Sequence, residues 1–207
     1  CKSAGEAPSS VEEAAAFVSA LLDAAGVQKA ALVGHSWGSL IALEAAAQLR
    51  DRVSHLVLVG TAYPMKVSPA LIESSLNEPE KALAMVNVFS RSTLAAPPSA
   101  LGPGTWVYGA SLALGRRVLA SNKVVNVFHT GFKACDSYAG GEAAMEKVSC
   151  PVLFALGAVD QMTTPKAAQS LIAKCAKPTM VHLPGGHHQM TETAEELLAA
   201  LKGFLRA

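Results

Sequence analysis

Hydrophobic positions near the start of the chain recur at helical spacing. Apolar side chains over residues 10–25 lie three and four positions apart, which predicts an amphipathic helix. Ser10 followed by Glu13 predicts a capping box at the start of this helix, and Gly26 predicts its end. The chain therefore opens with one amphipathic helix.

Continuous apolar runs follow this helix. Residues 29–34 and 53–61 are short runs of this kind and predict two buried strands. An alanine-rich helix is predicted between them, over residues 37–50. Strand, helix and strand joined by short connections predict a parallel α/β sheet.

The same pattern returns at the end of the chain. Residues 151–157 and 179–184 predict two more strands, with a helix near residues 165–175 between them. Thr193 and Glu196 predict the cap of a final helix. The apolar residues of this last helix are Leu197, Leu198, Leu201 and Phe204.

The strand pattern is absent from the middle of the chain. Residues 78–90 and 105–120 have helical periodicity, residues 94–104 are a Pro/Gly-rich loop, and residues 138–142 predict a break between helices. We therefore expect three segments: a partial α/β core over residues 1–61, a helical insertion over residues 62–149, and the rest of the same core over residues 150–207.

Composition narrows the class of protein. A chain of 207 residues that is 51% hydrophobic fits one compact unit, and its net charge of +1 argues against nucleic acid or anionic lipid as a partner. We therefore expect a small-molecule substrate, no membrane contact and an oligomeric state that the sequence leaves open. The four cysteines include no CxxC pair, so neither a disulfide framework nor a zinc site is predicted.

Features that bear on location are few. No apolar stretch reaches the length of about 18 residues that a membrane span requires, and the first ten residues lack the apolar middle of a secretion signal. These features and the cysteine pattern lead us to expect a reducing compartment and a cytoplasmic protein. The sequence begins at Cys1, so a targeting segment before it would not be seen.

A G-x-S-x-G pentapeptide, Gly34-His35-Ser36-Trp37-Gly38, lies where the first predicted strand meets a helix. Such a turn can hold the Ser36 side chain clear of the sheet as a nucleophile. The two glycines are then expected to lack side chains because strand and helix approach closely there. His35 is expected to pack at this turn. The alternative is an ordinary strand-to-helix turn, in which Ser36 has no chemical role.

A serine nucleophile requires a base and an acid that orients the base. Asp160 follows the third predicted strand, and His187 and His188 follow the fourth. The order Ser, Asp, His, each at the end of its own parallel strand, predicts a catalytic triad. Asp160 could instead cap the next helix, and His188 could be the base instead of His187. No metal site is expected, since the histidines lack ligand spacing.

These motifs resemble the α/β-hydrolase superfamily, in particular small bacterial serine hydrolases with a helical cap. The resemblance rests on "GHSWGS", "GAVDQMTTP" and "GGHHQMTETAEELLAAL". It implies an α/β-hydrolase fold, with Ser36 as nucleophile, Asp160 as orienting acid and the Trp37 amide in the oxyanion hole. His187 is implied as base because it directly follows a glycine. No cofactor is implied.

The resemblance also implies strands that this sequence lacks. Family members carry about four strands before the first one seen here, and one of their turns supplies a second oxyanion amide. Without them, we expect residues 29–34 to form an exposed sheet edge and the activity of this chain alone to be impaired. The expected function is hydrolysis of small to medium apolar carboxylic esters. The alternatives are carbon–carbon or amide hydrolysis, a non-catalytic ligand-binding protein and an inactive fragment.

Overall fold

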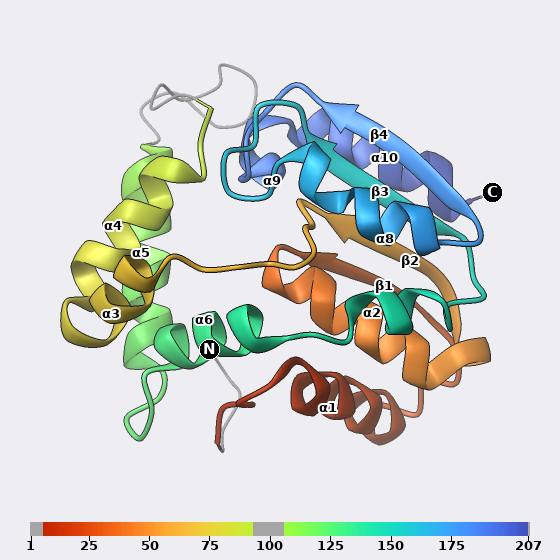
Figure 1. The fold of residues 1–207 in the computed structure, drawn as a ribbon, viewed down its shortest axis with the longest axis horizontal. Helices are drawn as coiled ribbons and strands as arrows, with labels where there is room; N and C mark the ends of the chain where they lie inside the picture. Colours follow the sequence, from red (N-terminus) through yellow and green to blue (C-terminus); the bar gives the residue numbers. More distant parts are fainter. Residues whose placement is uncertain (1–5, 93–105, 207) are drawn as a thin grey trace.

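A computed structural model describes residues 6–92 and 106–206, and the loop predicted over residues 94–104 lies outside the described residues. Its centre is a four-stranded parallel sheet with the strand order β1-β2-β3-β4 (Figure 1). The parallel α/β sheet expected from the sequence is confirmed. The strands are β1 (Ala30–His35), β2 (Val53–Val59), β3 (Val152–Gly157) and β4 (Pro178–Leu183).

The strands differ in how far they are covered. Every residue of β3 is buried, because β3 pairs with β2 on one side and with β4 on the other. β1 pairs only with β2 within the described sheet, and its Val33 side chain is 52% exposed. The expected exposed apolar edge is therefore present.

Helices cover both faces of the sheet. On one face, α2 (Trp37–Leu49), α7 (Gly141–Met145) and α8 (Gln169–Lys174) enclose the largest apolar cluster, which includes Leu43, Phe154 and Leu171. On the other face, α10 (Ala194–Leu205) packs against β2, β3 and β4. The result is three layers, with the sheet in the middle (Figure 1).

The first helix, α1 (Val11–Ala24), packs against α2. The Ser10 hydroxyl accepts a hydrogen bond from the Glu13 N–H at 3.1 Å, as the capping box requires. The Glu13 carboxylate binds the backbone and hydroxyl of Ser9 instead of the Ser10 amide. Gly26 has a φ of +67°, a left-handed conformation that ends the helix.

The middle of the chain is helical in its described part, as expected. Its helices are α3 (Pro69–Asn77), α4 (Pro79–Phe89), α5 (Val107–Ala120) and α6 (Val127–Ser137), followed by α7. Figure 1 shows α3, α4 and α5 gathered to one side, beyond one end of the strands. The predicted break at residues 138–142 is confirmed, because α6 ends at Ser137 and α7 begins at Gly141.

One expected cap is wrong in its chemistry. The last helix begins after Thr193, as predicted, but the Thr193 side chain makes no capping hydrogen bond. Its hydroxyl donates to the Gln189 carbonyl at 3.2 Å, because the short helix α9 (Gln189–Glu192) places that acceptor directly before it. Two single-turn 3-10 helices, Arg50–Arg52 and Pro165–Ala168, complete the described elements.

Candidate active site

Ser36 forms the sharp turn between β1 and α2. Its φ of 53° and ψ of −125° lie outside the regions that side chains favour, and such strain persists where the surroundings enforce it. The Ser36 N–H donates to the Val59 carbonyl at 2.9 Å, which ties the turn to β2. Its hydroxyl makes no capping hydrogen bond to α2. The hydroxyl is therefore not occupied in capping the helix.

The two glycines of the motif differ in their surroundings. A side-chain carbon on Gly34 would overlap the backbone of Gly38 and Ser39, so strand and helix meet here as the sequence predicts. A carbon on Gly38 would meet no described atom within 4 Å outside its own helix. The expected steric reason for Gly38 is therefore wrong, because its open side faces away from the strand–helix contact.

Trp37 is the first residue of α2, where backbone N–H groups have no acceptor within the helix. The N-terminal end of a helix also carries partial positive charge, which favours a developing anion. The Trp37 ring packs against Gly131 of α6. The Ser39 hydroxyl stabilises the turn through two hydrogen bonds. It donates to the Ser36 carbonyl at 2.5 Å and lies 2.7 Å from the Thr61 hydroxyl.

Asp160 lies directly after β3 and is 3% exposed. Its Oδ1 accepts hydrogen bonds from the backbone N–H groups of Met162 and Thr163, at 2.8 and 2.9 Å. Its Oδ2 lies 2.8 Å from His187 Nδ1. Burial acts to raise the pKa of the Asp160 carboxyl, but the hydrogen bonds from His187 and Thr163 outweigh it and hold that pKa below its usual range. One oxygen thus serves the local turn, and the other faces the imidazole.

His187 is the imidazole that Asp160 contacts. Its side chain is almost fully buried, and the residue is 3% exposed. Because the neighbouring carboxylate accepts a hydrogen bond, the proton of the neutral ring lies on Nδ1 and the lone pair on Nε2. This is the tautomer that a general base needs.

The adjacent His188 has different partners. Its N–H donates to the Ser90 carbonyl at 2.9 Å, and its ring makes no hydrogen bond with Asp160 in the described structure. Burial, with the charge of Arg91 and the neighbouring histidines, lowers the pKa of His188 to about 4. The geometry therefore favours His187 over His188 as the partner of Asp160.

Thr163, Gly60 and His35 surround this pair. The sequence analysis gave Thr163 and Gly60 no role and gave His35 only a packing role. The Thr163 hydroxyl lies 2.8 Å from Asp160 Oδ2, 3.0 Å from His187 Nδ1 and 2.9 Å from the Gly60 carbonyl. The sequence signal was Asp160 itself, because an aspartate can accept hydrogen bonds from backbone N–H groups two and three positions on, which brings Thr163 beside it. His35 packs, as expected, at the turn between β1 and α2, which we call the elbow. It also donates a hydrogen bond to the His187 carbonyl.

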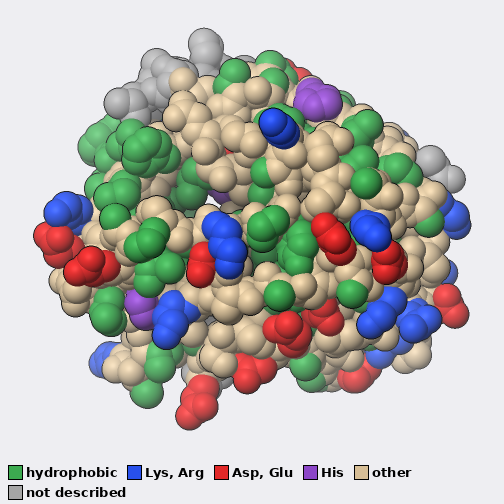
Figure 2. All heavy atoms as spheres, in the orientation of Figure 1, with side chains coloured by type: hydrophobic (Ala, Val, Ile, Leu, Met, Phe, Trp, Pro, Cys, Tyr) green, Lys and Arg blue, Asp and Glu red, His purple; other side chains and the backbone are tan. Residues whose placement is uncertain are grey.

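A cavity of about 670 Å³ opens between the elbow and the helices α3 to α6. Ser36, Trp37 and His187 line it together with Lys66, whose ammonium donates to the Asp136 carbonyl at 2.7 Å. Lys66 carries the only fixed charge among the described lining residues. Figure 2 shows hydrophobic side chains gathered over the helices at the left. The apolar lining includes Met65, Val67, Leu71, Met85, Phe89, Phe128 and Phe132.

The structure therefore brings Asp160 and His187 into direct contact, and Ser36 onto the same cavity. No hydrogen bond joins the Ser36 hydroxyl to the His187 ring among the described residues; in unliganded enzymes such a bond often tightens only when substrate is bound. Within the described part of the chain, no group of His, Cys, Asp and Glu side chains is arranged to hold a metal ion. No described helix is long and apolar enough to span a membrane.

Comparison with known families agrees with this geometry. The family model for the alpha/beta hydrolase fold matches residues 2–95, and the model for serine hydrolase (FSH1) matches residues 109–190. The chain has the α/β-hydrolase fold. The two matches include the elbow in one segment and the aspartate and histidine in the other, so this α/β hydrolase is matched on both halves of its site. No curated protein matches the chain.

Solved structures extend the similarity to the whole fold. A thermophilic esterase is 26% identical, with a TM-score of 0.80 over 100% of this α/β hydrolase and 77% of the esterase. A hydrolase from Pseudomonas aeruginosa PA01 is 23% identical, with a TM-score of 0.77 over 99% of this chain and 75% of the other. An enol-lactonase from Burkholderia xenovorans LB400 is 22% identical, with a TM-score of 0.79 over 99% and 76%. The hydrolase and esterase matches support a hydrolytic enzyme.

Proposed function

We propose that this α/β hydrolase cleaves apolar carboxylic esters through an acyl-enzyme formed on Ser36. The single observation that carries the proposal is the buried His187–Asp160 pair on the cavity that Ser36 lines, with a Ser36 hydroxyl not used as a helix cap. An imidazole oriented by a buried carboxylate is the base that a serine hydroxyl requires.

The steps follow from the protonation states of these groups. His187 Nε2 takes the hydroxyl proton as Ser36 Oγ attacks the substrate carbonyl, and the Trp37 N–H stabilises the oxyanion of the tetrahedral intermediate. His187 then gives the proton to the leaving alcohol, and the C–O bond of the ester breaks. In the second half, His187 takes a proton from the water that attacks the acyl-enzyme. It then returns this proton to Ser36 Oγ as the acyl C–O bond breaks, which releases the acid and restores the free enzyme.

The cavity supports an uncharged, apolar acyl or alcohol group. The helices α3 to α6 act as the cap over this cavity in the proposal, and the residues that they contribute are mostly hydrophobic. A carboxylate buried against them would lose its hydration, and the only cation on the described lining, Lys66, lies outside these helices and is bound to the Asp136 carbonyl. Lactones are cyclic esters and need the same chemistry, as the enol-lactonase neighbour illustrates for its own substrate.

Labelling with a fluorophosphonate probe tests the nucleophile. The expected result is one modified peptide containing Ser36, located by mass spectrometry, that is absent in Ser36→Ala and retained in Ser170→Ala, a serine of α8 that does not line the cavity. Loss of labelling in both variants, or labelling elsewhere, contradicts the proposal. A folded chain that is not labelled at all favours a non-catalytic ligand-binding protein.

Two matched esters test the substrate class. Hydrolysis of p-nitrophenyl butyrate is expected to exceed that of the p-nitrophenyl monoester of succinate in kcat/KM by about tenfold or more, because the succinyl carboxylate would enter the apolar cavity. Equal values contradict an apolar substrate site. Amide and carbon–carbon bond substrates, tested beside them, distinguish ester hydrolysis from the other reactions that the same triad supports.

A further inference from the structure

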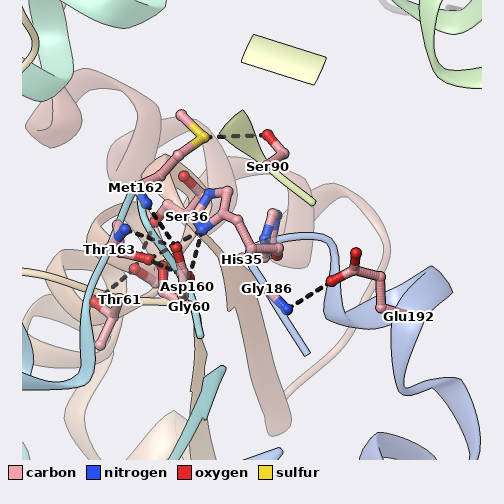
Figure 3. Close-up of polar contacts among 12 residues, drawn as sticks. His35, Ser36, Gly60, Thr61, Ser90, Asp160, Met162, Thr163, Gly186 and Glu192 are labelled. Atoms are coloured by element: carbon pink, nitrogen blue, oxygen red, sulfur yellow. Dashed lines mark hydrogen bonds and ion pairs between the residues drawn. The ribbon is translucent and has the colours of Figure 1, made fainter. Parts of the chain in front are cut away.

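Glu192 joins the loop that carries His187 to the far end of α4. Its Oε2 accepts a hydrogen bond from the Gly186 N–H at 2.5 Å (Figure 3). Its Oε1 accepts from the Ser92 N–H at 2.8 Å and from the Ser92 hydroxyl at 3.1 Å. One carboxylate thus holds the residue before His187 and a residue a hundred positions away in the sequence.

Gly186 fits closely into this junction. A side-chain carbon on Gly186 would lie 2.8 Å from Ser92 N, closer than real side chains approach, and 3.0 Å from Glu192 Oε2. The backbone before His187 is therefore pressed against the end of α4. This contact also gives a physical reason for the glycine that precedes the histidine in the motif.

The residue after His187 is tied to the same end of α4. The His188 N–H donates to the Ser90 carbonyl at 2.9 Å. Arg91 anchors this end in turn, since its side chain is buried and donates to Asn87 and Ser111 at 3.2 and 2.6 Å. Both neighbours of His187 are thus held by one segment, which is itself fixed to α5.

We propose that Glu192 is a positioning residue, which sets the place of the His187 ring by holding Gly186 against Ser92. The inference rests on the proposed function, because it concerns the base of that reaction. His187 Nδ1 is fixed by Asp160, but the height of the ring over Ser36 depends on its backbone, and Glu192 fixes that backbone. Small displacements of a catalytic group have large effects on rate.

Glu192→Gln tests this role with little change of shape. A carboxylate offers acceptors at both oxygens, whereas an amide has one acceptor and one donor group. The glutamine NH₂ must therefore face either Gly186 or Ser92 and lose that hydrogen bond. Glu196→Gln is the matched control, because it removes the same charge from an exposed position on α10.

Two measurements decide the outcome. With p-nitrophenyl butyrate, Glu192→Gln is expected to lower kcat by about tenfold with KM changed less than about twofold, and Glu196→Gln to change neither. By hydrogen exchange, amides of residues 185–188 are expected to exchange faster in Glu192→Gln only. Thermal unfolding of both variants shows whether a lower kcat reflects loss of fold instead.

The two readouts separate this proposal from the proposed function. A Glu192→Gln chain with the wild-type kcat and wild-type exchange overturns the positioning role and leaves ester hydrolysis standing. A wild-type chain that hydrolyses no ester and resists the fluorophosphonate probe contradicts the proposed function. Exchange in residues 185–188 then still decides whether Glu192 holds this loop.

Discussion

His35 Nε2 lies 2.8 Å from the backbone carbonyl oxygen of His187, and the two rings are 4.7 Å apart. A carbonyl only accepts hydrogen bonds, so the proton of the His35 ring lies on Nε2. Burial, with the adjacent His187 ring, lowers the pKa of His35 to about 4. The residue next to Ser36 is therefore a neutral donor that holds the loop of the proposed base.

Replacing His35 tests this link. His35→Phe keeps an aromatic ring but leaves the His187 carbonyl without its donor, and an unpaired buried group costs about 1–3 kcal/mol of stability. We expect a lower free energy of unfolding in urea and a lower kcat for p-nitrophenyl butyrate. His35→Gln, which keeps a side-chain N–H donor, is expected to lose less of both. The idea is wrong if the two variants behave alike.

Acid should destabilise the fold before carboxylates titrate. The pKa values of His35 and His188 are about 4 in the folded chain and near 6.5 when unperturbed. Between these values the unfolded chain binds protons that the folded chain does not, so stability present above pH 6.5 is lost as pH falls toward 4. The slope is at most about 1.4 kcal/mol per pH unit for each histidine.

Urea unfolding at pH 7, 6 and 5 measures this slope. His35→Gln removes one of the two groups and is expected to flatten the curve. A wild-type stability that is constant from pH 7 to pH 5 contradicts the prediction. The Asp160 carboxyl does not contribute to the slope between pH 7 and pH 5, because its lowered pKa places its own titration at lower pH.

The sequence was sufficient to predict that Asp160 and His187 lie together beside the cavity that Ser36 lines. Strands were recognisable because each is a short apolar run, and parallel strands bring their carboxyl ends to one edge of a sheet. Asp160 and His187, far apart in the sequence, therefore come within 2.8 Å. Ser36 reaches the same cavity for the same reason.

Other contacts could not be predicted from periodicity. The bond from Ser92 to Glu192 spans a hundred residues and depends on how α4 is placed over the sheet, which no local pattern encodes. Thr193 had the right residue type for a cap, but its hydroxyl donates to a carbonyl of α9 and does not cap the last helix. Gly38 fits the motif without a steric need, which only the coordinates of its neighbours reveal.

Thr163 is expected to support the His187–Asp160 pair. Thr163→Val keeps the shape but removes the hydroxyl that lies 2.8 Å from Asp160 Oδ2 and 2.9 Å from the Gly60 carbonyl. We expect a loss of about 1–3 kcal/mol in the free energy of unfolding, together with a lower kcat. Thr163→Ser restores the hydroxyl and should recover most of both. Steady-state kinetics and urea unfolding of the two variants provide the comparison.

The elbow predicts opposite outcomes for its two glycines. Gly34→Ala would drive a methyl group into the backbone of Gly38 and Ser39, which cannot move aside as a flexible side chain can. The expected cost is about 3 kcal/mol or more, at the upper end for overpacking. Gly38→Ala meets open space, and alanine favours a helix by about 1 kcal/mol over glycine, so this variant should be as stable as the wild type or more so. Urea unfolding of the two single variants measures the difference. Equal destabilisation of the two variants would contradict this prediction. It would mean that close packing between β1 and α2 requires a glycine at both positions.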